Sequence, residues 1–106
     1  MAFRRIITRT GNSPISTLPT AIKTEFDRLV SIGTVTRTEV FVTNPADLAE
    51  QNIGPNEFKS TITEIWLNQT ECNNFKQWTA DNHSSVFEAW KTTNNIADTL
   101  ISSGEI

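Results

Sequence analysis

The clearest hydrophobic pattern in the chain lies in residues 61–90. Residues 61–67 alternate between two faces, which predicts a strand with Ile65 on one face and with Glu64 and Trp66 on the other. One face is apolar at its centre, whereas the other mixes apolar and charged side chains.

A helix is predicted directly after this strand. Asn68 has the residue type of an N-cap, and Glu71 completes a capping-box spacing, so the helix should begin near Gln69. Apolar residues follow at helical spacing, which indicates an amphipathic helix folded back onto the strand. Its apolar stripe consists of Cys72, Phe75 and Trp78, and Asp81 and Asn82 are expected to end it.

A second helix is predicted from about Val86 to Ile101. Ser85 and Glu88 form another capping-box pattern, and apolar residues continue toward the C-terminus at helical spacing. The weak point of this helix is the pair Asn94 and Asn95.

The N-terminal part of the chain predicts a strand, a helix and a strand. Phe3–Thr10 favours a strand, and a helix is expected to open at Ser16 or Thr17 and to end at Gly33. Thr34–Thr43 is rich in β-branched residues and alternates, which predicts the second strand.

The connection Asn44–Phe58 is long for a link between two strands. Asn44 and Pro45 predict a capped helical turn at its start, and Gly54 with Pro55 ends it. Connections of this length are often functional or mobile, so this one is a candidate lid or partner-binding loop. The alternative is an ordinary surface loop.

This order of elements predicts an α+β fold of the ferredoxin-like type, with helices packed on one face of an antiparallel sheet. The 106 residues are expected to form a single domain. An apolar patch containing Phe41 and Trp66 would lie on the uncovered face and predicts a sheet-to-sheet contact with another copy, hence a homodimer. The residues expected under the helices are Val40, Val42, Ile65 and Leu67.

Composition narrows the functional classes. The formal net charge of −3 and the dispersed basic residues argue against a nucleic-acid partner, and the cluster Arg4, Arg5 and Arg9 is interpreted as a solvated strand edge. The single cysteine excludes an internal disulfide, no spacing fits a metal, and no cofactor is expected. Without a signal peptide or a long apolar run, we expect a soluble cytoplasmic protein with no membrane partner. The Asn- and Thr-rich composition is compatible with an AT-rich genome, such as that of a virus or phage.

The mixed face supplies the candidate site. Glu39 and Glu64 are expected near each other and could form an acid–base pair, with an interfacial salt bridge as the structural alternative. His83 lies in a polar junction, where capping or solvation is its ordinary role and catalysis the less favoured one. Cys72 is expected to be a buried, inert thiol. The candidate pocket or interface consists of Arg37, Glu39, Phe41, Glu64 and Trp66.

The run from Ile62 to Trp90 resembles the second half of the small dimeric α+β-barrel proteins, in the antibiotic-biosynthesis-monooxygenase-like and haem-degrading group. The resemblance implies ferredoxin-like units that pair their sheets into a shared, dimeric α+β barrel. It also implies a final strand where the periodicity predicts a helix. Haem-degrading relatives have a histidine ligand just after the V-F-x-A segment, where this chain has Trp90 and Lys91, so haem degradation is not implied. The matching residues are Trp66, Phe75, Trp78, Val86, Phe87 and Ala89.

Two functions follow from the sequence. The first is a small accessory or binding protein that self-associates through its sheet. The alternative is a cofactor-free, monooxygenase-like enzyme with a pocket in the barrel interior, lined by Phe41, Glu64 and Trp66. A cavity of several hundred Å³ with converging polar groups favours the enzyme, and a filled interior favours the accessory protein.

Overall fold

The computed structural model describes residues 1–15 and 17–106. Its four strands form one antiparallel sheet in the order β2-β3-β1-β4. This order defines a ferredoxin-like α+β fold, as the sequence predicts. The elements are β1 (Phe3–Asn12), α1 (Thr20–Ser31), β2 (Val35–Phe41), α2 (Pro45–Glu50), β3 (Glu57–Trp66), α3 (Gln69–Asn94) and β4 (Ala97–Glu105).

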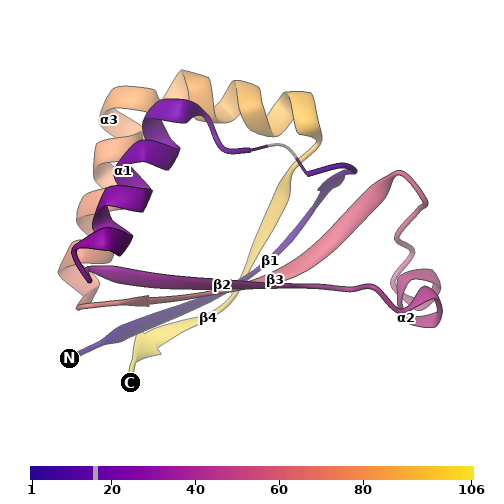
Figure 1. Cartoon of the computed structure of the whole chain (residues 1–106), viewed down its shortest axis with the longest axis horizontal. Coiled ribbons are helices and arrows are strands. Elements are labelled where there is room, and N and C mark those ends of the chain that lie inside the picture. Colours follow the sequence, from indigo (N-terminus) through magenta and orange to yellow (C-terminus); the bar gives the residue numbers. More distant parts are fainter. Residues whose placement is uncertain (16) are drawn as a thin grey trace.

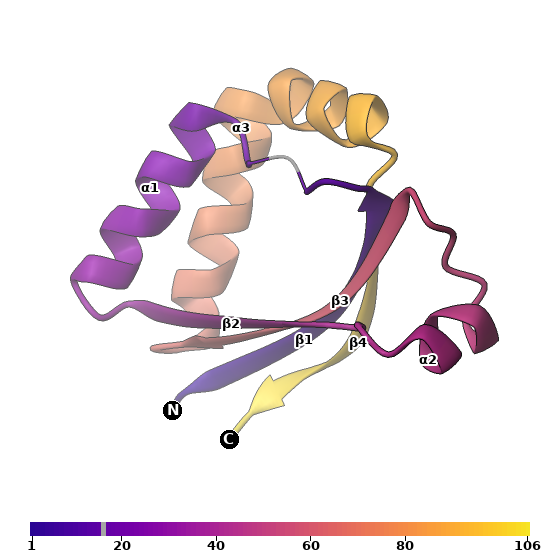
Figure 2. The ribbon, with the colours of Figure 1, turned by 45° about the vertical axis from the view of Figure 1, so that its right-hand side comes forward.

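Helices α1 and α3 lie over the same face of the sheet, and α2 lies apart from them beyond the end of β2 (Figures 1 and 2). The two ends of the chain are neighbours because β1 and β4 pair: the Ile106 N–H donates to the Ala2 carbonyl at 3.0 Å. The opposite face of the sheet is covered by no helix of the described chain.

The predicted helix boundaries are confirmed at three points. The Asn68 side chain accepts a hydrogen bond from the Glu71 N–H at 2.9 Å, as expected of an N-cap. Asn44 caps α2 in the same way through the Ala46 N–H at 2.8 Å. Gly33 follows α1 with a φ of 81°, a conformation that favours glycine.

The start of α1 differs from the prediction. The helix begins at Thr20, and Pro19 occupies the cap position because its fixed φ suits the residue just before the first turn. Of the two starting residues proposed from the sequence, Ser16 lies outside the described residues and Thr17 lies before the helix.

The two helices predicted after β3 form a single bent helix. Only His83 leaves helical geometry, with φ −140° and ψ 21°, so α3 changes direction there while its ribbon continues (Figure 1). The polar residues 81–85 therefore mark a kink instead of a chain break.

The prediction of a helix to Ile101 was wrong. Asn95 takes a left-handed conformation that ends α3, and the chain continues as β4. The apolar residues that suggested helical spacing are exposed in β4, whose order comes from backbone pairing with β1. The final strand implied by the family resemblance is present.

The assignment of the sheet faces was also wrong. Trp66 has no exposed surface, whereas Val40 and Leu67 are 69% and 60% exposed, so the helices cover the mixed face and not the aliphatic one. The prediction placed the helices on the aliphatic face because helices need an apolar surface to cover. In the structure the Glu64 carboxylate is neutralised by Arg5 and can therefore lie under the helices.

The main core cluster gathers around Trp66. Its indole packs edge-on against Phe26 and lies tilted against Phe75, with ring centroids 6.1 and 5.7 Å apart. Because this packing lies within one chain, the prediction that Trp66 lies at a dimer interface was wrong. The cluster consists of Phe3, Phe26, Leu29, Val35, Trp66 and Cys72.

The connection before β3 contains α2, which has no buried residue. Few apolar contacts are expected to hold such a segment, and its role as a lid or partner-binding loop stays a prediction.

Replacing Trp66 with alanine should lower the free energy of unfolding by about 3–5 kcal/mol, because it removes a fully buried indole and leaves a cavity. Urea denaturation of both proteins would measure this loss. Leu67→Ala is the matched control and should change stability by less than about 0.5 kcal/mol, because that side chain is exposed. Equal losses in the two variants would contradict the assignment of the faces.

Candidate functional site

A cavity of about 560 Å³ lies between the sheet and helices α1 and α3. Apolar side chains from both layers line it: Phe3, Ile7, Ile22, Phe26, Ile62 and Phe87. Helix α3 presents polar and small side chains at helical spacing to the same space: Cys72, Asn73, Lys76, Thr79, Ala80 and Ser84. The bend at His83 lets both halves of α3 contribute to this lining.

A partly buried ion pair lies on the sheet side of the cavity. The register of β1 and β3 places Arg5 directly opposite Glu64, and the guanidinium contacts Glu64 Oε1 at 2.8 Å and 3.0 Å. The Trp66 indole N–H donates to the same oxygen at 3.0 Å. The ion pair and the two hydrogen bonds, from Arg5 Nε and from the Trp66 indole, fix the carboxylate, and within the described chain Glu64 Oε2 receives no hydrogen bond.

Two further ion pairs lie along the sheet. Arg9 makes two hydrogen bonds to Asp98, at 2.7 and 2.9 Å, and both residues line the cavity. Arg37 lines the cavity as well and pairs with Glu39 at 3.0 Å, whose other oxygen accepts from the Ser60 hydroxyl at 2.6 Å.

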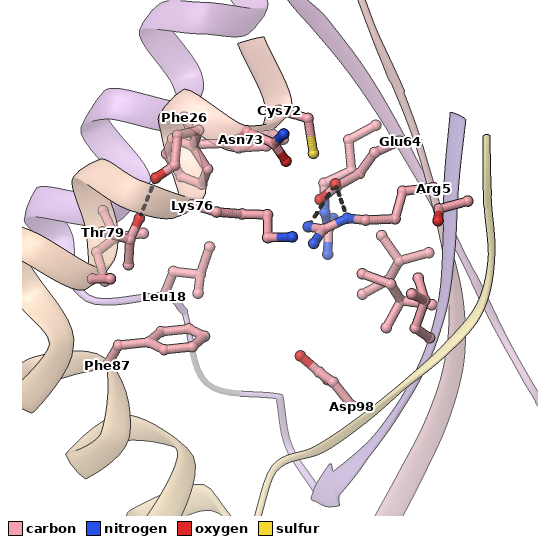
Figure 3. A pocket seen from close by; sticks show the side chains of 18 of the residues that line it. Arg5, Leu18, Phe26, Glu64, Cys72, Asn73, Lys76, Thr79, Phe87 and Asp98 are labelled. Carbon is pink, nitrogen blue, oxygen red and sulfur yellow. Dashed lines mark hydrogen bonds and ion pairs between the residues drawn. The ribbon is translucent and has the colours of Figure 1, made fainter. Parts of the chain in front are cut away.

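Cys72 lies at the cavity wall beside the central ion pair (Figure 3). Burial raises the pKa of its thiol above 9.0, Glu64 raises it further, and the positive charges of Arg5 and Lys76 oppose the rise. The sulfur is thus kept in its protonated form, as expected of an inert thiol.

The structure separates the five residues predicted to form the site. Arg37 and Glu64 line the cavity. Glu39 belongs to a separate ion pair and forms no acid–base pair with Glu64, since each carboxylate has its own cation. Trp66 lies behind the wall and positions Glu64, and Phe41 packs on Phe58 at 6.1 Å.

His83 contributes to shape. It lies at the bend of α3 with its ring 4.8 Å from that of Trp78, and it is not among the residues lining the cavity.

Sequence reasoning missed most of the polar cavity residues. Arg5 was interpreted as part of a solvated edge, although its alternation with Phe3 and Ile7 places all three on one face. Lys76 was not considered, although it lies one helical turn after Cys72. Asp98 could not be placed, because its segment was predicted to be helical.

Two classes of site receive no support in residues 1–15 and 17–106. No group of three or more His, Cys, Asp or Glu side chains there could hold a metal ion. No helix in the same residues is long and apolar enough to cross a bilayer.

Comparisons with known proteins do not assign the chain to a family. No protein-family model and no curated protein matches it. The solved structures that it resembles include a dimeric ferredoxin-like protein from an uncultured marine organism, with 12% identity, a TM-score of 0.49 and full coverage of both chains. Another is a hydantoinase/carbamoylase family amidase from Burkholderia ambifaria, with 11% identity and a TM-score of 0.45.

The match to the amidase covers 97% of this chain but only 28% of the amidase. Identities and TM-scores this low carry nothing about function. The fold and the cavity define the chain as a ferredoxin-like α+β protein with a cavity between its helices and its sheet, and the narrower resemblance to the monooxygenase-like group stays a prediction.

The Cys72 thiol should react with a chromogenic disulfide reagent at least about tenfold more slowly in the folded protein than in the denatured chain, because the thiolate is the reactive form and burial raises the pKa of the thiol. The raised pKa also makes stability depend on pH. Between pH 9.0 and the higher pKa of the folded protein, the folded state keeps the Cys72 thiol proton, whereas the unfolded chain loses it. Its contribution to stability is therefore complete below pH 9.0 and is lost as pH rises through the folded pKa. Cys72→Ala should flatten that alkaline decline, and an unchanged decline would contradict the assignment.

Proposed function

We propose that this protein binds a small molecule in the cavity between helix and sheet, and that it self-associates through the uncovered face of the sheet. The observation that carries the proposal is a cavity of about 560 Å³ that joins apolar walls to a fixed ion pair, Arg5 and Glu64. Ligand sites commonly combine a mainly apolar lining with a few oriented polar groups, in clefts of this size.

The lining itself supports binding. Lys76, Asn73 and Ala80 are solvent-exposed although they face the cavity, so no other side chain of the described chain fills the space beside them. The cavity is thus open to solvent, and its volume of about 560 Å³ lies within the range of small-molecule sites.

The uncovered sheet face supports self-association. Ile65 and Leu67 are 38% and 60% exposed there, and Ile6 lies diagonally across from Ile65 on the neighbouring strand. This location replaces the Trp66 face proposed from the sequence. An antiparallel sheet can expose one face to water. Threonines on this face reduce its apolar area, so the proposed contact is of modest strength.

An enzyme is the second candidate, favoured by the buried Glu64 carboxylate whose Oε2 is free of protein donors. A carboxylate in an apolar pocket can act as a proton acceptor, which suits chemistry that needs no cofactor. The cavity differs from the one predicted within a barrel, because it lies under the helices and only Glu64 of the three predicted lining residues borders it.

Filling the cavity should abolish binding. Wild-type protein should enhance the fluorescence of anilinonaphthalene sulfonate, which joins aromatic rings to one negative charge, and Ala80→Trp should weaken that binding at least about tenfold. Ala89→Trp is the matched control, since it adds the same bulk to α3 outside the cavity and should leave the affinity unchanged. Equal affinities in both variants would rule out the cavity as the binding site.

Placing a charge on the uncovered sheet face should weaken self-association. In sedimentation velocity the unmodified chain should have an apparent mass above its monomer mass of 11.9 kDa at micromolar concentration. Ile65→Arg should shift it toward the monomer, because the interface would then have to bury an unpaired charge. Val86→Arg adds the same charge to an exposed position of α3 and should have no effect. A wild-type monomer would overturn this part of the proposal.

A further inference from the structure

The charged side chains that line the cavity leave one positive charge without a partner. Each guanidinium has a carboxylate, and the Glu88 carboxylate has a lysine outside the cavity. Lys76 alone among the lining cations makes no ion pair or hydrogen bond within the described chain. The pairs are Arg5 with Glu64, Arg9 with Asp98, Arg37 with Glu39, and Lys91 with Glu88.

Lys76 extends from α3 into the cavity toward Arg5 and Glu64 (Figure 3). Cys72 lies beside the same three side chains at the cavity wall (Figure 3). Two cations and one carboxylate therefore meet there, so a bound anion would meet a net positive charge.

Glu64 provides a hydrogen-bond acceptor at the polar end of the cavity, which is formed by Arg5, Glu64 and Lys76. Oε1 accepts from Arg5 and from Trp66, whereas Oε2 accepts from no donor of the described chain. Among the described residues, Trp90 Nε1 is the one side-chain polar atom that is sealed from solvent and has no partner. Glu64 Oε2, which accepts no hydrogen bond, therefore keeps some exposed surface, and Glu64 lines the cavity. A carboxylate oxygen can only accept, and it therefore selects an O–H or N–H on the ligand.

Apolar side chains flank this polar end on two sides. Ile7 and Ile62 lie on the sheet, and Phe87 faces them from the second half of α3. A flat ring can contact both layers while its polar substituents reach Lys76 and Glu64.

We propose that the cavity takes a hydroxylated cyclic monocarboxylate: the ligand carboxylate pairs with Lys76 Nζ, its hydroxyl donates to Glu64 Oε2, and its ring lies between the sheet and Phe87. This inference rests on the proposed binding function and adds the chemical class of the ligand. Hydrogen bonds to charged groups are among the stronger ones, so each polar contact should be measurable separately.

Calorimetric titration with four naphthalene derivatives tests the ligand class: hydroxynaphthoate, naphthoate, naphthol and naphthylmethylamine. Hydroxynaphthoate should bind most tightly, with naphthoate and naphthol each about tenfold weaker and the ammonium compound weaker than both. This ranking uses only the wild-type protein, so it does not depend on whether any variant folds.

Two variants assign the contacts. Lys76→Met should remove the advantage of hydroxynaphthoate over naphthol. Lys59→Met is the matched control and should leave that advantage intact, because Lys59 lies on β3 and does not line the cavity. Glu64→Gln should reduce the advantage of hydroxynaphthoate over naphthoate, and circular dichroism would check that this variant remains folded.

The outcomes separate the two levels of the proposal. Equal affinity for all four probes, a preference for the ammonium compound, or an unchanged ranking in Lys76→Met would overturn the ligand class while leaving a binding cavity. Failure of every probe, including anilinonaphthalene sulfonate, would overturn the binding function itself.

Discussion

Glu64 is a carboxylate placed on the helix-covered face of an antiparallel sheet, and the arrangement around it depends on how that charge is satisfied. Removing an ion from water is costly unless it is paired and hydrogen-bonded. Arg5 supplies the opposite charge from the neighbouring strand β1, and the Trp66 indole supplies a further hydrogen-bond donor from β3, the strand that carries Glu64. Because Trp66 also anchors the aromatic cluster under α1 and α3, the polar contact and the apolar core fix each other's positions.

This coupling explains why the cavity lies beside the core. The tightly packed residues gather near one end of β3, where Trp66 contacts Phe26 and Phe75. Beyond Glu64 the helical layer is provided by the second half of α3, which the bend at His83 directs away from the first. A straight helix would continue in the direction of its first half, whereas the bend brings Trp90 of α3 to Arg9, whose guanidinium lies 5.3 Å from the Trp90 ring centroid.

The sequence allowed the fold class to be predicted because the order of elements and most of their boundaries depend on local signals. The Asn68 and Asn44 caps and the Gly33 terminator are residue types that act on their own backbone. The C-terminal strand could not be predicted in this way, because its exposed residues also suit a helix and its order comes from distant backbone pairing with β1. Propensity is a weak guide where tertiary pairing decides.

The candidate site was only partly predictable, for a related reason. Alternation correctly placed Arg37, Glu64 and Trp66 on one face, but it could not say which face the helices cover. That choice depended on Arg5, whose position opposite Glu64 follows from strand register and is not visible in either strand alone.

Stability and the proposed binding depend on different side chains in this fold. Trp66 and Cys72 are almost fully buried and belong to the core, whereas Lys76 and Ala80 lie on the same helix as Cys72 and face open space. Exposed positions contribute little to the free energy of folding, so residues there can change the chemistry of the cavity at small cost. Glu64 is the exception, because it lines the cavity while its Oε1 accepts hydrogen bonds from Arg5 and from the core residue Trp66. A substitution of Glu64 that changes the acceptor Oε2 therefore also changes the contacts that Oε1 makes with Arg5 and Trp66.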